Sequence, residues 1–177
     1  MAMECKEFHP YPYQQFCIQH IIDHPAAGLF VDMGMGKTVM TLTAFNYLKY
    51  YAWQIQRCLV IAPKKVAEAT WRTEISGWQH LRHLRCSEVL GTATQRRAAM
   101  AVDADVYVTN RDNVQWLVKE YGKAWPFDMV VLDESSSFKN HQAKRFKALR
   151  AMRPKIKRIV ELTGTPSPHG LMDLWAH

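Results

Sequence analysis

The sequence of 177 residues lacks the features of a membrane or secreted protein. No apolar run approaches the roughly 20 residues that a membrane span needs, and the N-terminal stretch MAMECKEFHP has no apolar core of a signal peptide. The four cysteines are widely separated and form no C-x-x-C pair, which disfavours a zinc or redox site and suits free thiols in a reducing compartment. We therefore expect a cytoplasmic protein with no membrane partner, located in the host cell if its source is viral.

Acidic residues are missing from one long stretch. The chain has 23 Lys and Arg against 16 Asp and Glu, a net charge of +7, and no acid occurs between Ser135 and Val160. Such a basic block forms either a solvated face or a surface along a nucleic-acid backbone. Internal repeats and low-complexity segments are also absent, and the length fits one domain over residues 1–177, which we expect to be monomeric.

Short β-branched and aromatic runs alternate with longer amphipathic stretches. The predicted strands are residues 28–32, 57–62, 87–90, 105–109, 129–133 and 158–163, and the predicted helices are 38–51, 64–79, 93–102, 111–121 and 140–152. Several strands are almost wholly apolar, as in parallel strands that helices cover on both faces. The pattern predicts an α/β fold with a doubly wound, mostly parallel central sheet, in which ligands bind beyond the carboxyl ends of the strands.

The segment GLFVDMGMGKTVMTL, residues 28–42, predicts a phosphate-binding loop. Two close glycines precede Lys37, which enters the first turn of a helix, where the helix dipole already places positive charge. An anion beside Lys37 would relieve this repulsion, and the hydroxyl of Thr38 suits a magnesium ion. The general consensus asks for glycine where Val31 stands, so a glycine-rich turn with a solvated lysine is the alternative.

Two more polar groups follow predicted strands. Asp133 and Glu134 end the most apolar strand, where two adjacent carboxylates are costly without a cation. Asp133 suits a ligand of magnesium, and Glu134 suits a base that orients and deprotonates water, although two acids that cap a helix are the alternative. The Thr-Gly-Thr-Pro run at 163–166 suits a sensor of a nearby phosphate, but by itself it also fits a simple turn.

Together these motifs resemble the first RecA-like lobe of superfamily-two helicases, and most of all the Swi/Snf-type DNA-dependent ATPases of phage and bacteria. DMGMGKT at 32–38 is similar to that family's first motif, acidic-Met-Gly-x-Gly-Lys-Thr, so Val31 no longer counts against the loop. LDES at 132–135 resembles the family's Asp-Glu box, and LTGTP at 162–166 resembles its third motif. The resemblance runs from Tyr11 to Trp175 with the motifs in the expected order.

The resemblance implies ATP and Mg²⁺ as cofactors and a role for each site residue. The implied catalytic residues are Lys37, Asp133 and Glu134, with Thr38 and Asp133 at the metal. The implied nucleotide-binding residues are Tyr13, Gln14, Met33, Gly34, Met35, Gly36, Lys37 and Thr38, of which Gln14 reads the adenine edge. Coupling of nucleotide state to DNA is implied for Thr163, Gly164 and Thr165. Contact with the nucleic-acid backbone is implied for Pro63, Lys64, Lys65, Thr109, Asn110 and Arg111.

The helix expected after Pro63 has two different faces. Lys64 and Lys65 crowd its start, where positive charge costs a few tenths of a kcal/mol and where a phosphate would relieve the cost. On the opposite face apolar residues recur at spacings of three and four, so we expect Trp71 and Trp78 in the core.

Two departures from the family limit what the resemblance implies. Ser135 and Ser136 stand where Ala-Asp or Ala-His is usual, and the second RecA-like lobe with its arginine finger is not within these residues. We therefore expect slow ATP hydrolysis or none from this chain. The expected function is the ATP-binding half of a motor that moves on duplex DNA. RNA as the track, a small phosphotransferase and a non-catalytic nucleic-acid-binding module are the alternatives.

Overall fold

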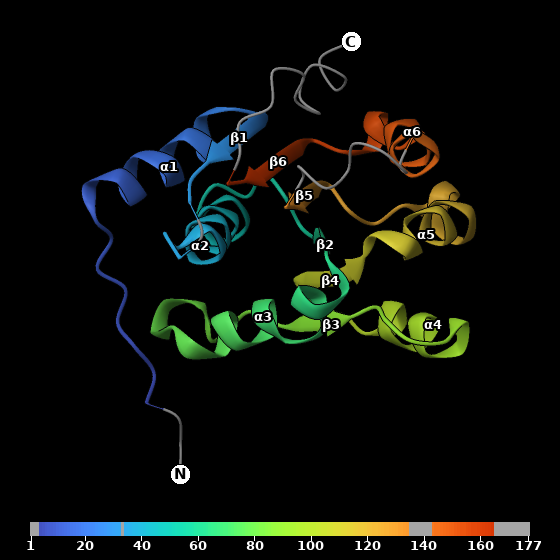
Figure 1. Cartoon of the computed structure of the whole chain (residues 1–177), viewed down its shortest axis with the longest axis horizontal. Helices are drawn as coiled ribbons and strands as arrows, with labels where there is room; N and C mark the ends of the chain where they lie inside the picture. Colours follow the sequence, from blue (N-terminus) through green and yellow to red (C-terminus); the bar gives the residue numbers. More distant parts are fainter. Residues whose placement is uncertain (1–3, 33, 135–142, 165–177) are drawn as a thin grey trace.

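The apolar runs of the sequence form one sheet of six parallel strands in the order β1-β6-β5-β2-β4-β3 (Figure 1). The computed structural model describes residues 4–32, 34–134 and 143–164. The strands are β1 (Ala26–Phe30), β2 (Cys58–Ala62), β3 (Cys86–Glu88), β4 (Val106–Asn110), β5 (Met129–Asp133) and β6 (Arg158–Thr163). The prediction of an α/β fold with a parallel sheet is confirmed.

Helices cover both faces of the sheet, with α1, α2 and α3 on one side and α4, α5 and α6 on the other (Figure 1). Their bounds are α1 (Pro12–Asp23), α2 (Lys37–Tyr50), α3 (Lys64–Gly77), α4 (Ala93–Ala101), α5 (Val114–Tyr121) and α6 (Ala143–Ala151). Among the described residues, no helix combines the length and the apolar character needed to cross a membrane.

The two faces of the sheet belong to two separate parts of the core, as β2 illustrates. Cys58, Val60 and Ala62 pack with the side chains of α1, α2 and α3, whereas Leu59 and Ile61 pack with those of α5 and α6. Every residue of this strand is buried, because successive side chains point to opposite faces and helices cover both. The apolar runs therefore lack the alternation of a half-exposed strand.

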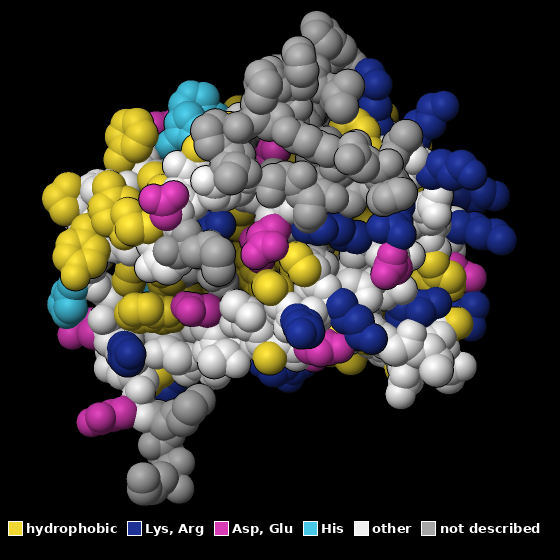
Figure 2. Space-filling model, in the orientation of Figure 1, with side chains coloured by type: hydrophobic (Ala, Val, Ile, Leu, Met, Phe, Trp, Pro, Cys, Tyr) yellow, Lys and Arg dark blue, Asp and Glu magenta, His cyan; other side chains and the backbone are white. Residues whose placement is uncertain are grey.

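The described part of the basic block forms α6 and the segment that follows it. Phe146 and Leu149 point into the core, while Lys144, Lys147 and Arg150 are exposed. Dark blue side chains gather on the side of the molecule where α6 lies (Figure 1, Figure 2). Within the described part of the block, α6 is thus an amphipathic helix whose charged face is accessible to a polyanion.

Three details differ from the expectations. Helix α1 was not predicted, because its exposed face carries aromatic side chains such as Phe16, which is 72% exposed, and these blur the amphipathic pattern. Strand β1 lies two residues earlier than expected, since it pairs with β6 only from Ala26 to Phe30. The segment expected as one helix at 111–121 begins with a 3₁₀ turn over Arg111–Asn113 before α5.

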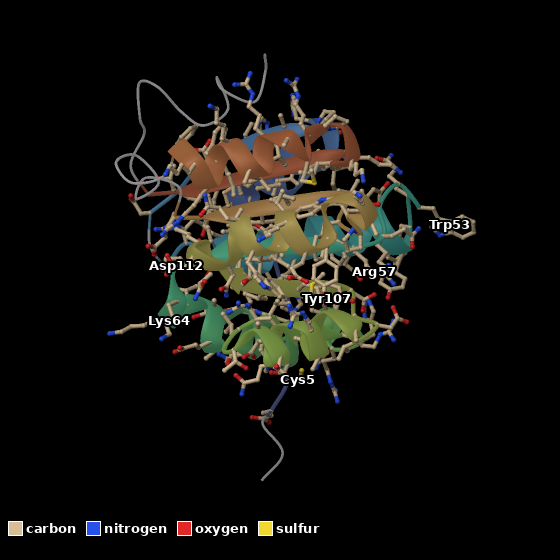
Figure 3. The ribbon with its side chains drawn as sticks, turned by 90° about the vertical axis from the view of Figure 1, so that its right-hand side faces the viewer. Cys5, Trp53, Arg57, Lys64, Tyr107 and Asp112 are labelled. Atoms are coloured by element: carbon tan, nitrogen blue, oxygen red, sulfur yellow. The ribbon has the colours of Figure 1, made fainter. Side chains whose placement is uncertain are left out.

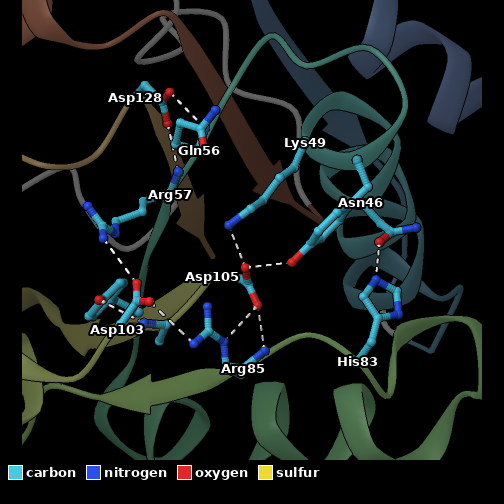
Figure 4. A network of polar contacts seen from close by, with 12 residues as sticks. Asn46, Lys49, Gln56, Arg57, His83, Arg85, Asp103, Asp105 and Asp128 are labelled. Carbon is cyan, nitrogen blue, oxygen red and sulfur yellow. Dashed lines mark hydrogen bonds and ion pairs between the residues drawn. The ribbon is translucent and has the colours of Figure 1, made fainter.

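Aspartates hold the edge of the sheet where the strands begin (Figure 4). The fully buried carboxylate of Asp105 accepts hydrogen bonds from the ammonium of Lys49, the hydroxyl of Tyr50 at 2.9 Å and the backbone amide of Arg85 at 2.7 Å. These contacts join the end of α2 to the starts of β3 and β4. Asp128 likewise accepts from two backbone amides just before β2.

Candidate nucleotide site and nucleic-acid groove

The predicted motifs meet at the edge of the sheet where the strands end. β1, β6 and β5 are neighbours in the sheet, so the segments that follow them lie side by side. The phosphate loop (residues 31–36) follows β1. Thr163 is the last residue of β6 and precedes Gly164, and Asp133 is the last residue of β5 and precedes Glu134, with which it forms the acidic pair. Met33 and Thr165 lie outside the described residues. A parallel α/β sheet places its ligand sites at this edge.

Two glycines in left-handed conformations shape the phosphate loop. Gly34 has a φ of 82° and Gly36 a φ of 85°, which side-chain-bearing residues rarely adopt. Gly36 caps α2, and its carbonyl accepts a hydrogen bond from the amide of Met40. Lys37 is therefore the first residue of the helix, and Thr38 follows it, as predicted.

Gln14 and Tyr13, at the start of α1, attach that helix to the phosphate loop. The hydroxyl of Tyr13 donates to the carbonyl of Met35 at 2.9 Å, and the side-chain amide of Gln14 donates to the same carbonyl at 3.4 Å. Gln14 is buried, and its side-chain oxygen accepts from the amide of Tyr11 at 2.9 Å. In this structure Gln14 thus supports the loop, and its expected contact with adenine stays a prediction.

Replacing Gly36 with alanine should destabilise the chain more than replacing Gly34. Both substitutions force a side chain into the left-handed region, at about 1 kcal/mol each. A Cβ atom at Gly36 would lie 2.7 Å from Nε2 of Gln14, whereas Gly34 has no atom within 4 Å of the same position. Moving Gln14 breaks its hydrogen bonds. In urea unfolding, Gly36→Ala should therefore lose about 1–2 kcal/mol more of the free energy of unfolding than Gly34→Ala. Equal losses for the two variants would contradict the close packing of Gln14 on the loop.

A cavity of about 560 Å³ opens between the phosphate loop, α1 and α3. Its volume falls within the range of small-molecule and nucleotide sites. Lys37 and Thr38 line it together with both glycines of the loop. The remaining lining residues are Glu7, Phe8, His9, Tyr11, Tyr13, Gln14, Val39, Glu74 and Trp78. The residues predicted to bind phosphate therefore share one cavity with Tyr13 and Gln14.

The acidic pair ends the fully buried strand β5. The carboxylate of Asp133 accepts a hydrogen bond from the indole Nε1 of Trp71, at 3.0 Å. Burial raises the pKa of the Asp133 carboxyl above its usual value, against the opposing effects of this hydrogen bond and of the positive charge on Lys37. Glu134 has a φ of 53°, an uncommon conformation for a residue other than glycine. Trp71 was expected in the core and is fully buried there, but its contact with Asp133 was not foreseen.

Arg111 holds the backbone of the acidic pair from another element. Its guanidinium donates to the carbonyls of Asp133 at 3.2 Å and Glu134 at 2.7 Å. Burial lowers the pKa of this guanidinium, although the nearby carboxylates oppose the shift. The position of Arg111 just after β4 was a signal for this contact, since it places the residue at the same edge as the acids.

The predicted nucleic-acid segments line a second, smaller groove of about 260 Å³. The groove residues are Ala62, Pro63, Lys64, Asn110, Arg111, Asp112 and Arg145. Lys64 and Asp112 lie on one side of the molecule, opposite Trp53 (Figure 3). Lys64 and Lys65 begin α3 and are exposed, as expected.

Thr109 and Thr163 are both buried at this edge of the sheet. The hydroxyl of Thr109 donates to the carbonyl of Val89 at 2.8 Å, so the burial of its side chain does not favour the expected contact with nucleic acid. Gly164 is exposed beside the phosphate loop, where a Cβ atom would lie 3.8 Å from the carbonyl of Val31. The coupling role of Thr163 and Gly164 stays a prediction.

Residues 13–176 match the protein family described as SNF2-related domain. The chain belongs to this family. Putative protein p41 of Acyrthosiphon pisum secondary endosymbiont phage 1 is 42% identical over 96% of this chain and 38% of its own length. The mouse SWI/SNF-related matrix-associated actin-dependent regulator of chromatin subfamily A member 1 is 30% identical over 84% of this chain and 14% of its own length. The chain thus spans well under half of these relatives.

A solved structure supports the same assignment. The SWI2/SNF2 ATPase core of Sulfolobus solfataricus, in complex with double-stranded DNA, matches with a TM-score of 0.74 and 29% identity. The match covers 93% of this chain and 34% of that one. The predicted resemblance to the RecA-like lobe of Swi/Snf-type ATPases is therefore confirmed.

The side chains of this SNF2-related domain fit magnesium and ATP, the ligands that the family implies. Thr38 and Asp133 supply hard oxygen donors, which magnesium prefers. Lys37 begins the helix that follows β1, and Asp133 ends β5, so both residues lie at the carboxyl edge of the sheet. The glycines of the loop leave room for a phosphate chain to approach the backbone.

Proposed function

We propose that this chain is the ATP-binding lobe of a DNA-dependent ATPase motor of the Swi/Snf type. The observation that carries the proposal is the meeting of the phosphate loop and the acidic pair at one sheet edge, in a member of the SNF2-related family. Magnesium-bound ATP supplies the phosphoryl group that the motor transfers to water.

Each residue at this edge has a role in the proposal. Lys37 binds the β- and γ-phosphates, and Thr38 and Asp133 hold the magnesium ion. Glu134 orients a water molecule and accepts its proton. Thr163 lies on β6 between the two motifs, where it links the state of the nucleotide to the DNA surface.

The longer protein supplies the rest of the motor in this proposal. The chain spans 38% of the phage relative and 34% of the solved ATPase core. The proposed partner is a second RecA-like lobe whose arginine stabilises charge on the transferring phosphoryl group, an effect worth about 10³–10⁵ in rate in related chemistry. The 177-residue chain should therefore bind nucleotide but turn it over slowly or not at all.

Duplex DNA is the proposed track, and the groove at the start of α3 is its proposed contact. Replacing Lys64 and Lys65 together with alanine should weaken duplex binding at all sequences alike, because both are exposed cations that would contact phosphates. The slope of log K against log salt should fall by about 2, one for each lost phosphate contact. Fluorescence anisotropy between 50 and 200 mM salt, about the range in which such losses are large, measures both effects.

The matched control replaces Lys119 and Lys123 with alanine. Both lysines are exposed, but they lie at and after the C-terminal end of α5, which returns to the opposite edge of the sheet. Duplex affinity and salt slope should stay as in the parent chain. Equal losses in the two double variants would show that net charge, and not the groove, carries the binding. A parallel titration with duplex RNA tests whether RNA, the alternative track, binds to the same groove.

A further inference from the structure

Two residues outside the predicted catalytic set hold the acidic pair in place. Trp71 donates its indole N–H to the carboxylate of Asp133, and Arg111 donates its guanidinium to the carbonyls of Asp133 and Glu134. The first contact fixes a side-chain oxygen and the second fixes the main chain. Since a tryptophan and an arginine approach from different elements, α3 and the turn after β4, the acidic pair is restrained from two directions.

Both of these elements also form the groove. Arg111 itself lines it, and α3 begins at Lys64 on its wall. Trp71 follows Lys64 by seven residues, roughly 10 Å along the helix at about 1.5 Å per residue. A ligand that shifts α3 therefore moves Trp71, and a ligand that binds Arg111 moves its guanidinium. Both groups are hydrogen-bonded to the acidic pair.

We propose that Trp71 and Arg111 are positioning residues that set the geometry of Asp133 and Glu134 and make it respond to occupancy of the groove. The proposal rests on the proposed function for its ligands, magnesium-ATP and duplex DNA. Trp71 orients one oxygen of the Asp133 carboxylate and so directs the carboxylate at the metal. Arg111 holds Glu134 in its left-handed conformation through the two carbonyls.

Replacement of Trp71 with phenylalanine tests the first part. The ring stays apolar and buried, but the N–H that Asp133 accepts is lost. Calorimetry with a non-hydrolysable ATP analogue, in EDTA and in magnesium, gives the metal-dependent gain in affinity. This gain should fall by about tenfold, as is typical when a partner of a metal ligand is removed, while the metal-free affinity stays within about twofold. A gain equal to that of the parent chain would overturn the role of Trp71.

Trp125→Phe is the matched control. Trp125 is also buried, packs edge-to-face on Phe127 and belongs to the core on the other face of the sheet. Its replacement removes comparable volume without touching the acidic pair, so the metal-dependent gain should not change. An equal fall in both variants would show that loss of packing, and not the hydrogen bond to Asp133, is responsible.

The indole ¹H–¹⁵N signal of Trp71 tests the proposal without nucleotide. It is identified by its absence from Trp71→Phe, and it should shift in Arg111→Lys, which cannot span both carbonyls, but not in Arg145→Lys in the same groove. It should also shift when duplex DNA is added, whereas the signal of Trp125 should not. A Trp71 signal that is unmoved by Arg111→Lys and by duplex would overturn the proposal. A parent chain that binds no magnesium-ATP would instead overturn the proposed function, and the indole signal would still decide this inference.

Discussion

Replacing Lys37 with alanine is expected to weaken magnesium-ATP binding by about 100-fold or more, close to 3 kcal/mol. Lys37 is the first residue of α2 and lines the 560 Å³ cavity beside the two glycines. Among the described residues that line this cavity, Lys37 is the only lysine or arginine, so its loss removes charge-assisted hydrogen bonds to the phosphates. Isothermal calorimetry on the purified chain measures the change.

Lys64→Ala is the control for this experiment. Lys64 likewise occupies the first position of a helix, but it lines the groove and not the nucleotide cavity. Its replacement should leave magnesium-ATP affinity within about twofold, because Lys64 is exposed and does not line the cavity, and salt screens exposed charges. Nucleotide affinity that survives Lys37→Ala would mean that the cavity does not bind phosphate through this lysine, and the proposed function would lose its main support.

The carboxyl edge of the sheet could be predicted because its signals are local. Apolar runs that end in Asp133 or Thr163 mark the ends of buried strands, and parallel strands bring those ends to one edge. The start of α2 was predicted within one residue because the glycines before Lys37 interrupt the apolar run. The predicted bounds of β1 lie two residues too far toward the C-terminus, for a different reason. The apolar run continues past Phe30, but β6 has no further residue to pair with it.

The contacts of Trp71 and Arg111 could not be predicted in the same way. Trp71 is 62 positions from Asp133 in the chain, and only the packing of α3 against the sheet brings the two together. For Trp71 the sequence signal was only that a buried indole N–H needs a hydrogen-bond acceptor. For Arg111 it was only the position after β4, which gives the edge of the sheet but not the partner. The order β5-β2-β4 separates Asp133 from Arg111 by a whole strand, which local pattern does not reveal. These long-range contacts are where the structure adds most to the site.

The largest loss of stability is expected from Asp105→Asn, at about 3–5 kcal/mol in urea unfolding at pH 7. The side chain of Asp105 is fully buried, and that of Lys49 is only 15% exposed. An asparagine cannot balance the lysine charge, so a buried ammonium is left without its counter-ion. Because a domain of this kind has about 5–15 kcal/mol of total stability, the variant should be close to unfolding at elevated temperature.

The pH dependence of stability tests the same contact. Burial by itself raises the pKa of the Asp105 carboxyl, but hydrogen bonds from the Arg85 amide, Lys49 and Tyr50 outweigh it, and the pKa lies below its ordinary value. The unfolded chain therefore takes up the proton first as the pH falls. The contribution of the Asp105 carboxylate to the free energy of unfolding is complete at neutral pH. It is lost as the pH drops from about 5 through the lowered pKa. Over this pH range, the free energy of unfolding of the parent chain should fall more steeply than that of Asp105→Asn.

Asp103→Asn separates this buried contact from general surface charge. The Asp103 side chain is 70% exposed and pairs with Arg57 and Arg85, which are themselves 40% and 58% exposed. Exposed pairs of this kind contribute about 0–1 kcal/mol, so the variant should unfold almost as the parent chain does at pH 7. Similar losses for the two variants would contradict the view that desolvation makes Asp105 critical. A small loss for both would mean that the joint between α2, β3 and β4 does not depend on the buried ion pair.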